Sequence, residues 1–237
     1  EHYFSEYIDR LAETYAMRRP DMLALIAHWY NGYSWDGVHT LYVPFSTLVF
    51  LEQQTFANHW FSTATPTFLI KLLRQRQMPA YELDELSADS KLLDSADVNN
   101  INVYSLLFQT GYLTIKRAYP GPNGQEYDLG YPNYEVAQAM RSHLLVDYLD
   151  KPAAQMTTTI LSHLQKSLRS QNVEGFIKVL KSTFASIPYT LFLPQEAYYH
   201  SLVYLLLKLL GFTIHAEPLT NLGRIDGIRY GVRLDGD

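Results

Sequence analysis

Apolar residues recur three and four positions apart along most of the chain, and this spacing is the period of an amphipathic helix. It is clear in the opening segment, residues 2–17. The same spacing predicts further helices at residues 22–30, 66–78, 103–109, 153–170 and 173–186. Residues 194–210 are apolar on nearly all faces, which predicts a helix that is buried all round. Strand-like segments are few and short, so the pattern indicates a mostly helical α+β fold.

Two short strands lie between helices in the middle of the chain. Residues 112–116 and 126–130 are predicted as strands around a Pro- and Gly-rich turn at 120–124 that can continue neither strand. Asn133 is a suitable cap for the helix that follows. This order is typical of a winged-helix unit, and equally of an ordinary hairpin that braces two helices. The turn carries no Lys or Arg for phosphate contacts, which favours a packing role.

Two regions have weaker patterns. Residues 82–100 are polar and acidic with interspersed Leu, and they are predicted to form short helical turns. Residues 29–37 are dense in aromatic residues and turn formers, and a short strand at 40–43 is predicted after them. We expect these aromatic rings to pack in the core and around the turn, with stacking on nucleic-acid bases as the less favoured alternative.

The break at Asp150-Lys151-Pro152 suggests a domain boundary. We expect one domain at residues 1–150, which contains the winged-helix-like unit. A second region at 151–237 would contain two linker helices and a further α/β segment.

The amino-acid composition excludes several classes of functional site and partner. The chain has 237 residues, of which 47% are hydrophobic and 18% charged, so it can form a packed core. It has no Cys, which excludes disulfides, thiolate zinc sites and a cysteine nucleophile, and which fits a cytoplasmic protein. No apolar run is long enough to cross a bilayer, so no membrane partner is expected. The net charge of −5 argues against strong autonomous DNA binding, although a metal-dependent nuclease can be acidic.

Three carboxylates near the end of the chain are candidate metal ligands. Glu196 lies in the first turn of the predicted apolar helix, and Glu217 and Asp226 follow the break at Gly211. A carboxylate on a helix and another on an adjacent strand can hold a divalent cation. Each has an ordinary alternative. Asp226 precedes Gly227 in a common turn pair, Glu196 complements the helix dipole, and Glu217 is a strand-end acid of the kind that is usually solvated.

The same stretch carries Glu196 with Tyr199-His200, the apolar helix, Gly211, Glu217 and the string Gly223-Arg224-Ile225-Asp226. With these residues it resembles the PD-(D/E)XK nuclease superfamily, in particular a bacterial subfamily fused behind an AAA-ATPase-like domain. The resemblance implies that Asp226 is the first metal-binding acid and that Mg²⁺ or Mn²⁺ assists phosphodiester hydrolysis.

The nuclease signature is only half present. The family pattern requires a Glu-x-Lys on the strand after Asp226, but the last Glu is Glu217 and the last Lys is Lys208. Either a segment between Asp226 and Tyr230 is absent from this sequence, or the site is degenerate. The resemblance therefore implies a partial α/β nuclease-like domain, inactive or incomplete in this chain.

The first half resembles the AAA-ATPase-like family that carries this nuclease-like domain. The matching strings are WYNGY (29–33), VPFS (43–46), NHWF (58–61), LLFQTGYLTI (106–115) and YPNYEV (131–136). They correspond to the region after the nucleotide-binding core. No Gly-x-x-x-x-Gly-Lys-Ser/Thr occurs, so we expect no ATP hydrolysis.

Two functions follow from these patterns. The first is a metal-dependent nuclease-like domain attached to an ATPase module, with DNA as the partner. The second is a non-catalytic interaction module that docks its own ATPase core or another protein. A Glu-x-Lys strand after Asp226 would favour the first, and its absence from the molecule would favour the second.

Overall fold

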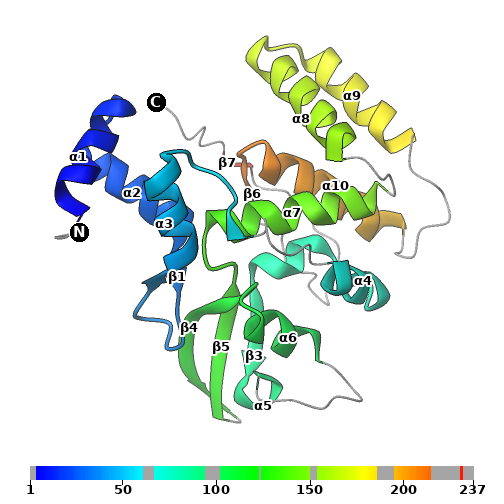
Figure 1. The fold of residues 1–237 in the computed structure, drawn as a ribbon. Coiled ribbons are helices and arrows are strands. Elements are labelled where there is room, and N and C mark those ends of the chain that lie inside the picture. Colours follow the sequence, from blue (N-terminus) through cyan, green and yellow to red (C-terminus); the bar gives the residue numbers. More distant parts are fainter. Residues whose placement is uncertain are drawn as a thin grey trace. The chain divides into compact units, whose positions relative to one another are not determined.

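The computed structural model describes residues 4–60, 67–93, 102–122, 124–149, 154–185, 195–214 and 230–231. Helices dominate these ranges, and the strands form small antiparallel sheets, so the mostly helical α+β fold is confirmed (Figure 1). The chain forms two compact units. The first contains residues 1–65 and 84–139, and the second contains residues 66–83 and 140–237. The domain boundary near residue 150 stays a prediction.

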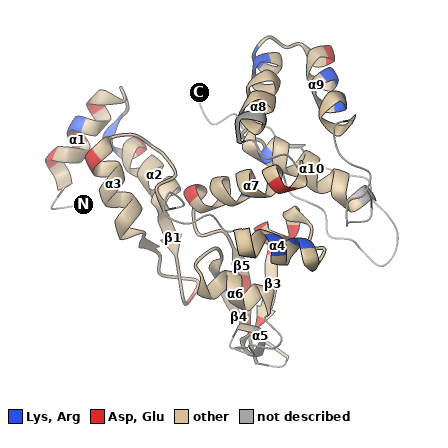
Figure 2. Cartoon of the chain, turned by 45° about the vertical axis from the view of Figure 1, so that its right-hand side comes forward, with Lys and Arg blue, Asp and Glu red and all other residues tan. Residues whose placement is uncertain are grey.

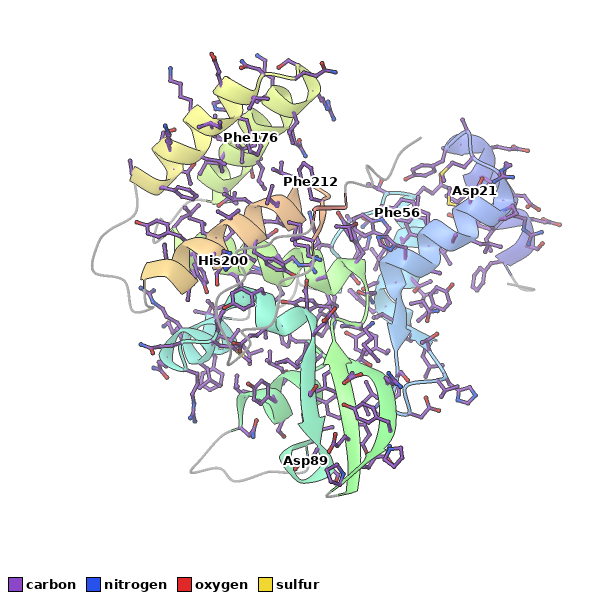
Figure 3. The ribbon with its side chains drawn as sticks, turned by 180° about the vertical axis from the view of Figure 1, so that it is seen from behind. Asp21, Phe56, Asp89, Phe176, His200 and Phe212 are labelled. Atoms are coloured by element: carbon purple, nitrogen blue, oxygen red, sulfur yellow. The ribbon has the colours of Figure 1, made fainter. Side chains whose placement is uncertain are left out.

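The first unit begins with three helices around an aromatic core. They are α1 (Ser5–Thr14), α2 (Arg19–Tyr30) and α3 (Pro44–Gln53), and Pro residues occupy the first turns of α2 and α3, where a missing N–H costs nothing. Buried residues from all three helices form the core: Ile8, Leu11, Ala12, Met22, Ile26, Tyr30 and Phe50. Phe56, labelled in Figure 3, stacks on Phe50 with ring centroids 4.3 Å apart.

The rest of the first unit is a three-stranded antiparallel sheet with short helices. The strands β3 (Leu86–Asp89), β4 (Thr114–Gly121) and β5 (Gly124–Gly130) have the order β3-β5-β4. Helix α6 (Val103–Gln109) precedes β4, and α7 (Tyr134–Tyr148) follows β5. The predicted helix, strand, turn, strand and helix are therefore confirmed. The Asn133 side chain caps α7, because its Oδ1 accepts from the Val136 N–H at 3.0 Å.

The sequence interpretation missed β3. The sequence predicts short helical turns at residues 82–100, of which 94–100 lie outside the described residues. Two such turns are present, a 3-10 helix (Ala80–Asp84) and the short helix α5 (Ser90–Leu93), but β3 lies between them. The reason is long-range pairing, since Leu86 pairs with Leu129. Leu86 and Ala88 are buried and alternate with less buried neighbours, but this period of two is too short to recognise in sequence.

The predicted turn at 120–124 is also shorter than expected. Strand β4 continues through Pro120 to Gly121, and Gly121 pairs with Gly124. Pro120 is tolerated because β4 is an outer strand of this sheet, where a missing N–H removes no hydrogen bond to a further strand.

The second unit is built around a buried helix. It contains α4 (Thr67–Gln75), the C-terminal part of α7, α8 (Ala154–Arg169), α9 (Val173–Ala185) and α10 (Gln195–Leu209). Leu202, Leu205 and Leu206 of α10 are fully buried, as the apolar pattern predicts. The Tyr198 hydroxyl donates to the Tyr148 carbonyl, and their rings stack with centroids 5.1 Å apart.

Polar contacts tie neighbouring segments to this helix and to α7. The Ser201 hydroxyl of α10 accepts from the Ala80 N–H at 3.2 Å, and Arg74 of α4 pairs with Asp147 of α7 at 3.5 Å. Within the described ranges, no helix is both long and apolar enough to cross a membrane.

Candidate functional site

The helix, the break at Gly211 and the first strand that the sequence predicts here form in that order. Helix α10 begins at Gln195, so Glu196 lies in its first turn. The helix ends before Gly211, whose φ of +90° is the left-handed conformation that glycine adopts readily at a helix end. Strand β6 (Thr213–Ile214) follows at once. The Glu196 side chain, Glu217 and Asp226 lie outside the part that the structure describes.

Strand β6 pairs with β7 (Tyr230–Gly231), the second strand after the helix. The pairing is antiparallel, with Thr213 opposite Gly231 and Ile214 opposite Tyr230. Residues 215–229, with Glu217 and Asp226 among them, therefore connect two paired strands. The sequence predicts a second strand that begins near Asp226; Asp226 lies outside the described residues, and β7 is Tyr230–Gly231.

The donor set expected here suits a hard cation. Glu196, Glu217 and Asp226 offer only carboxylate oxygens, which Mg²⁺ and Mn²⁺ prefer over sulfur ligands. Among the side chains that the structure describes, no three His, Asp or Glu residues are grouped in a way that could bind a metal.

A buried carboxylate joins distant segments of the first unit. Glu135 lies in the first turn of α7 and is fully buried. Its Oε1 accepts from the backbone N–H groups of His59 and Trp60 at 2.7 and 2.9 Å, whereas its Oε2 has no hydrogen-bond partner among the described residues. Burial is the main cause that raises the pKa of the Tyr30 phenol to about 12, and the Glu135 charge adds to it.

Backbone contacts close to Glu135 are tight. A Cβ on Gly32, whose φ is +133°, would lie 1.9 Å from the Pro132 carbonyl oxygen, so only glycine fits there. Lys116 Nζ donates to the same oxygen at 3.1 Å. The Tyr33 hydroxyl donates to the Gly111 carbonyl at 2.8 Å.

These contacts bring together four of the sequence strings that carry the family resemblance. They are residues 29–33, the described part of 58–61, 106–115 and 131–136. Their residues meet inside the first unit and hold it together. Sequence reasoning missed Glu135, because an acid in a first helical turn normally indicates only dipole compensation.

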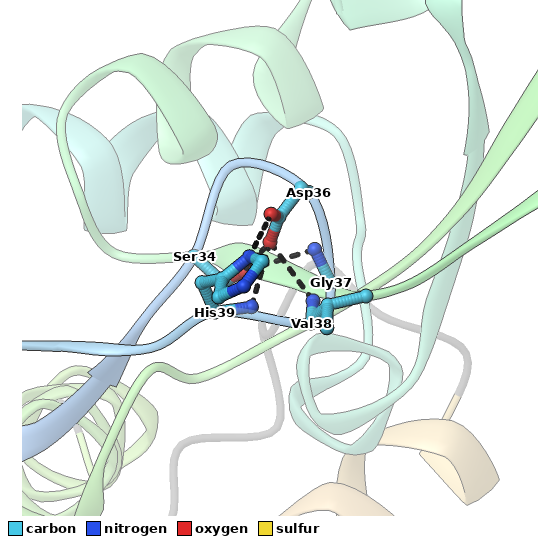
Figure 4. A network of polar contacts seen from close by, with 5 residues as sticks. All are labelled: Ser34, Asp36, Gly37, Val38 and His39. Atoms are coloured by element: carbon cyan, nitrogen blue, oxygen red, sulfur yellow. Dashed lines mark hydrogen bonds and ion pairs between the residues drawn. The ribbon is translucent and has the colours of Figure 1, made fainter.

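The loop between β1 (Asn31–Tyr33) and β2 (Leu41–Tyr42) is organised by one carboxylate (Figure 4). Asp36 Oδ1 accepts from the N–H groups of Val38 and His39 at 2.9 and 2.8 Å and from the Ser34 hydroxyl at 3.1 Å. His39 Nδ1 lies 2.6 Å from Asp36 Oδ2. This contact is the main cause that lowers the pKa of Asp36 and raises the pKa of His39.

This loop and the following helix expose large apolar side chains. We call them the apolar patch: Trp35, Val38, Leu41, Tyr42, Phe45 and Leu48. Trp35 is 66% and Phe45 is 50% exposed. By contrast, Trp29 packs against Phe56 and Tyr134 with ring centroids 5.5 and 4.7 Å away. The expectation of core packing is therefore right for Trp29 and wrong for Trp35.

Comparisons with known proteins give one informative relative. No family model matches the chain, and no solved structure matches it. A curated protein of Azotobacter chroococcum mcd 1, described as an uncharacterized protein in the vnfD 5' region, is 36% identical over 206 residues. The match covers 85% of this chain, but the chain spans only 39% of the relative's length. That description states no activity.

Proposed function

We propose that the C-terminal part of the chain is a metal-dependent phosphodiesterase of the nuclease type. Asp226 and Glu196 are its catalytic and metal-binding acids, and Glu217 is a further metal ligand. The observation that carries this proposal is the order of elements around the nuclease-like string. A buried helix with Glu196 in its first turn ends at Gly211, and two antiparallel strands follow whose connection contains Asp226.

The residues of this chain divide the chemistry between them. Asp226, Glu196 and Glu217 would hold the cation through carboxylate oxygens. When bound, Mg²⁺ or Mn²⁺ would supply activation of a water molecule and stabilisation of the charge that develops on the phosphate. Residues 227–237 contain no Glu-x-Lys.

Cleavage of supercoiled plasmid DNA with added Mn²⁺ tests this proposal. The unmodified protein should nick the plasmid, and Asp226→Asn should lower the rate at least about a hundredfold, since it removes a ligand of the ion that supplies most of the transition-state stabilisation. The matched control is Asp235→Asn, which removes the same charge outside the predicted ligand set. Nicking that is absent, or that survives in Asp226→Asn, would falsify the nuclease proposal.

A second candidate function is a non-catalytic interaction module, and the apolar patch favours it. Large apolar side chains that gather on one exposed segment are typical of protein interfaces, and aromatic residues are enriched there. Residues 35–48 supply all six members of the patch. The partner on this interpretation is the protein's own ATPase core or another protein.

A binding experiment tests this candidate. The part of the Azotobacter relative outside the 206 matched residues is expressed separately and titrated with this protein in a calorimeter. Replacing both Trp35 and Phe45 by Ser should weaken binding at least about a hundredfold, because buried aromatic anchors carry most of an interface's energy. Val173→Ser is the control, since Val173 is an exposed apolar residue elsewhere. Equal affinities of the unmodified protein, the double variant and Val173→Ser would show that the apolar patch is not the binding surface.

A further inference from the structure

Helices α8 and α9 form a well-defined antiparallel pair. The turn between them is fixed by local hydrogen bonds. The Asn172 N–H donates to the Ser167 carbonyl at 2.8 Å, and the Asn172 side chain accepts from the Gly175 N–H at 2.8 Å. Gln171 adopts a left-handed conformation with φ of +53°. Leu164 of α8 is fully buried. The pair therefore presents its outward side chains on a fixed scaffold.

This helix pair is basic within an acidic protein. It carries four cations, which are Lys166, Arg169, Lys178 and Lys181. Its one acid is Glu174, so four positive charges less one negative charge give +3 with His163 neutral, whereas the whole chain has a net charge of −5. Figure 2 shows Lys and Arg on both helices.

The four cations are exposed and have no partner among the side chains that the structure describes. None of them forms an ion pair or a side-chain hydrogen bond with another described residue. Other surface arginines behave differently, since Arg18 pairs with Asp21 at 2.7 Å and Arg19 with Asp9 at 3.3 Å. The α8–α9 pair thus carries four exposed positive charges without an acidic partner among the described residues.

The C-terminal half of α8 also carries a shallow depression that is open to solvent and lined by side chains with polar end groups. Its lining residues are Ser162, Gln165, Lys166, Arg169 and Ser170. Hydroxyl, amide, ammonium and guanidinium groups are the donors that contact phosphate oxygens in proteins. Lys166 and Arg169 also complement the negative end of the α8 dipole, but that role does not account for Lys178 and Lys181, which lie away from the C-terminal end of α9.

We propose that the α8–α9 pair is a contact surface for the phosphate backbone of a nucleic acid. The contact is independent of base sequence, because point charges on exposed side chains read phosphates and not base edges. The inference deepens the proposed nuclease function, on which it rests for the identity of the polyanion. It also supplies the phosphate contacts that the β4–β5 turn lacks, because that turn has no Lys or Arg between Tyr119 and Tyr131.

An anionic membrane is the competing occupant of a basic surface. Leu168, Val173 and Ile177 are exposed on the same helix pair and could enter a bilayer surface. The nuclease proposal, on which this inference rests, favours the phosphates of a nucleic acid over those of a lipid surface. The test therefore includes vesicles of phosphatidylserine and phosphatidylcholine.

The test measures binding of a short fluorescein-labelled DNA duplex of mixed sequence by anisotropy, in EDTA and over a series of salt concentrations. The test variant replaces Lys166, Arg169, Lys178 and Lys181 by Gln. A control variant with the same change in net charge replaces Arg10, Arg18, Lys71 and Arg117 by Gln. At low salt the affinity of the test variant should fall at least about tenfold. The slope of its log affinity against log salt should become shallower by about 0.9 for each phosphate that it no longer neutralises. The control should bind nearly as tightly as the unmodified protein.

Three results would overturn the inference: no binding by the unmodified protein at low salt, equal reductions in affinity in the test and control variants, or weaker vesicle binding with unchanged duplex binding. Failure of the nuclease proposal is distinguishable, because EDTA removes the metal and Asp226→Asn should leave duplex affinity unchanged. Duplex binding through the four cations without any cleavage would retain the contact surface and reject the nuclease.

Discussion

At the scale of single residues, Glu135 is the side chain with the largest expected effect on stability. Glu135→Ala leaves the buried N–H groups of His59 and Trp60 without an acceptor. We expect the free energy of unfolding to fall by about 3 kcal/mol, because each unsatisfied buried donor costs about 1–3 kcal/mol. Urea unfolding followed by circular dichroism measures this. Glu135→Gln keeps one acceptor oxygen and should cost less. Equal destabilisation in both variants would show that the accepting oxygen does not matter.

The pair of Asp36 and His39 predicts a dependence on pH. The pKa of Asp36 is lowered in the folded loop, so its contribution is present above the ordinary Asp pKa of 3.8 and is lost as the pH falls through the lower folded value. The pKa of His39 is raised, so its contribution is present below 6.5 and is lost as the pH rises through the higher folded value. The loop is therefore most stable between these two ordinary values.

Nuclear magnetic resonance can follow this titration directly. The His39 ring should titrate above pH 6.5, and Asp36→Asn should return its pKa towards that value. The amides of Val38 and His39 should exchange more slowly, relative to their intrinsic rates, at about pH 6 than at about pH 8. A His39 pKa that Asp36→Asn does not change would contradict the predicted ion pair.

At the scale of elements, local sequence patterns predicted the helices well. Helix α6 (Val103–Gln109) has the bounds that its apolar spacing and the following Gly111 predict. The leucines at 202, 205 and 206 of α10 are buried as predicted, but the helix is not buried all round, because Tyr199 is 42% exposed. Strand β3 could not be predicted in the same way, since its pairing with β5 joins residues about forty positions apart. Helical spacing is a local property, whereas strand pairing depends on the rest of the chain.

The candidate sites also differ in how far the sequence predicts them, because some depend on local sequence and others on long-range packing. The order of α10, Gly211 and β6 follows from local sequence, so the frame around the proposed nuclease acids was predictable. The role of Glu135 was not, because its two donors lie 75 and 76 residues away in the chain. The apolar patch was missed because the exposure of Trp35 depends on tertiary packing, which sequence spacing does not show: Trp29 packs against the core, whereas Trp35 is 66% exposed.

At the scale of the whole molecule, the two compact units are not consecutive in sequence. Residues 66–83 belong to the second unit, although they are flanked by residues of the first. The chain therefore passes from the first unit to the second and back, so a substitution that unfolds one unit can also disturb the segments that connect it to the other. Variants that test the nuclease acids should be checked for folding by thermal melting, as should those of the apolar patch.

The Glu135 contact has a consequence for synthesis on the ribosome. The three N-terminal helices can collapse around Phe50 early, because their core residues all precede residue 51. The segment at His59 and Trp60 must wait until Glu135 has left the exit tunnel, and until then its two amides have no protein acceptor from α7. During the synthesis of these intervening residues, the N-terminal part of the nascent chain is incompletely folded. Incompletely folded chains of this kind are the ones that bind chaperones and aggregate.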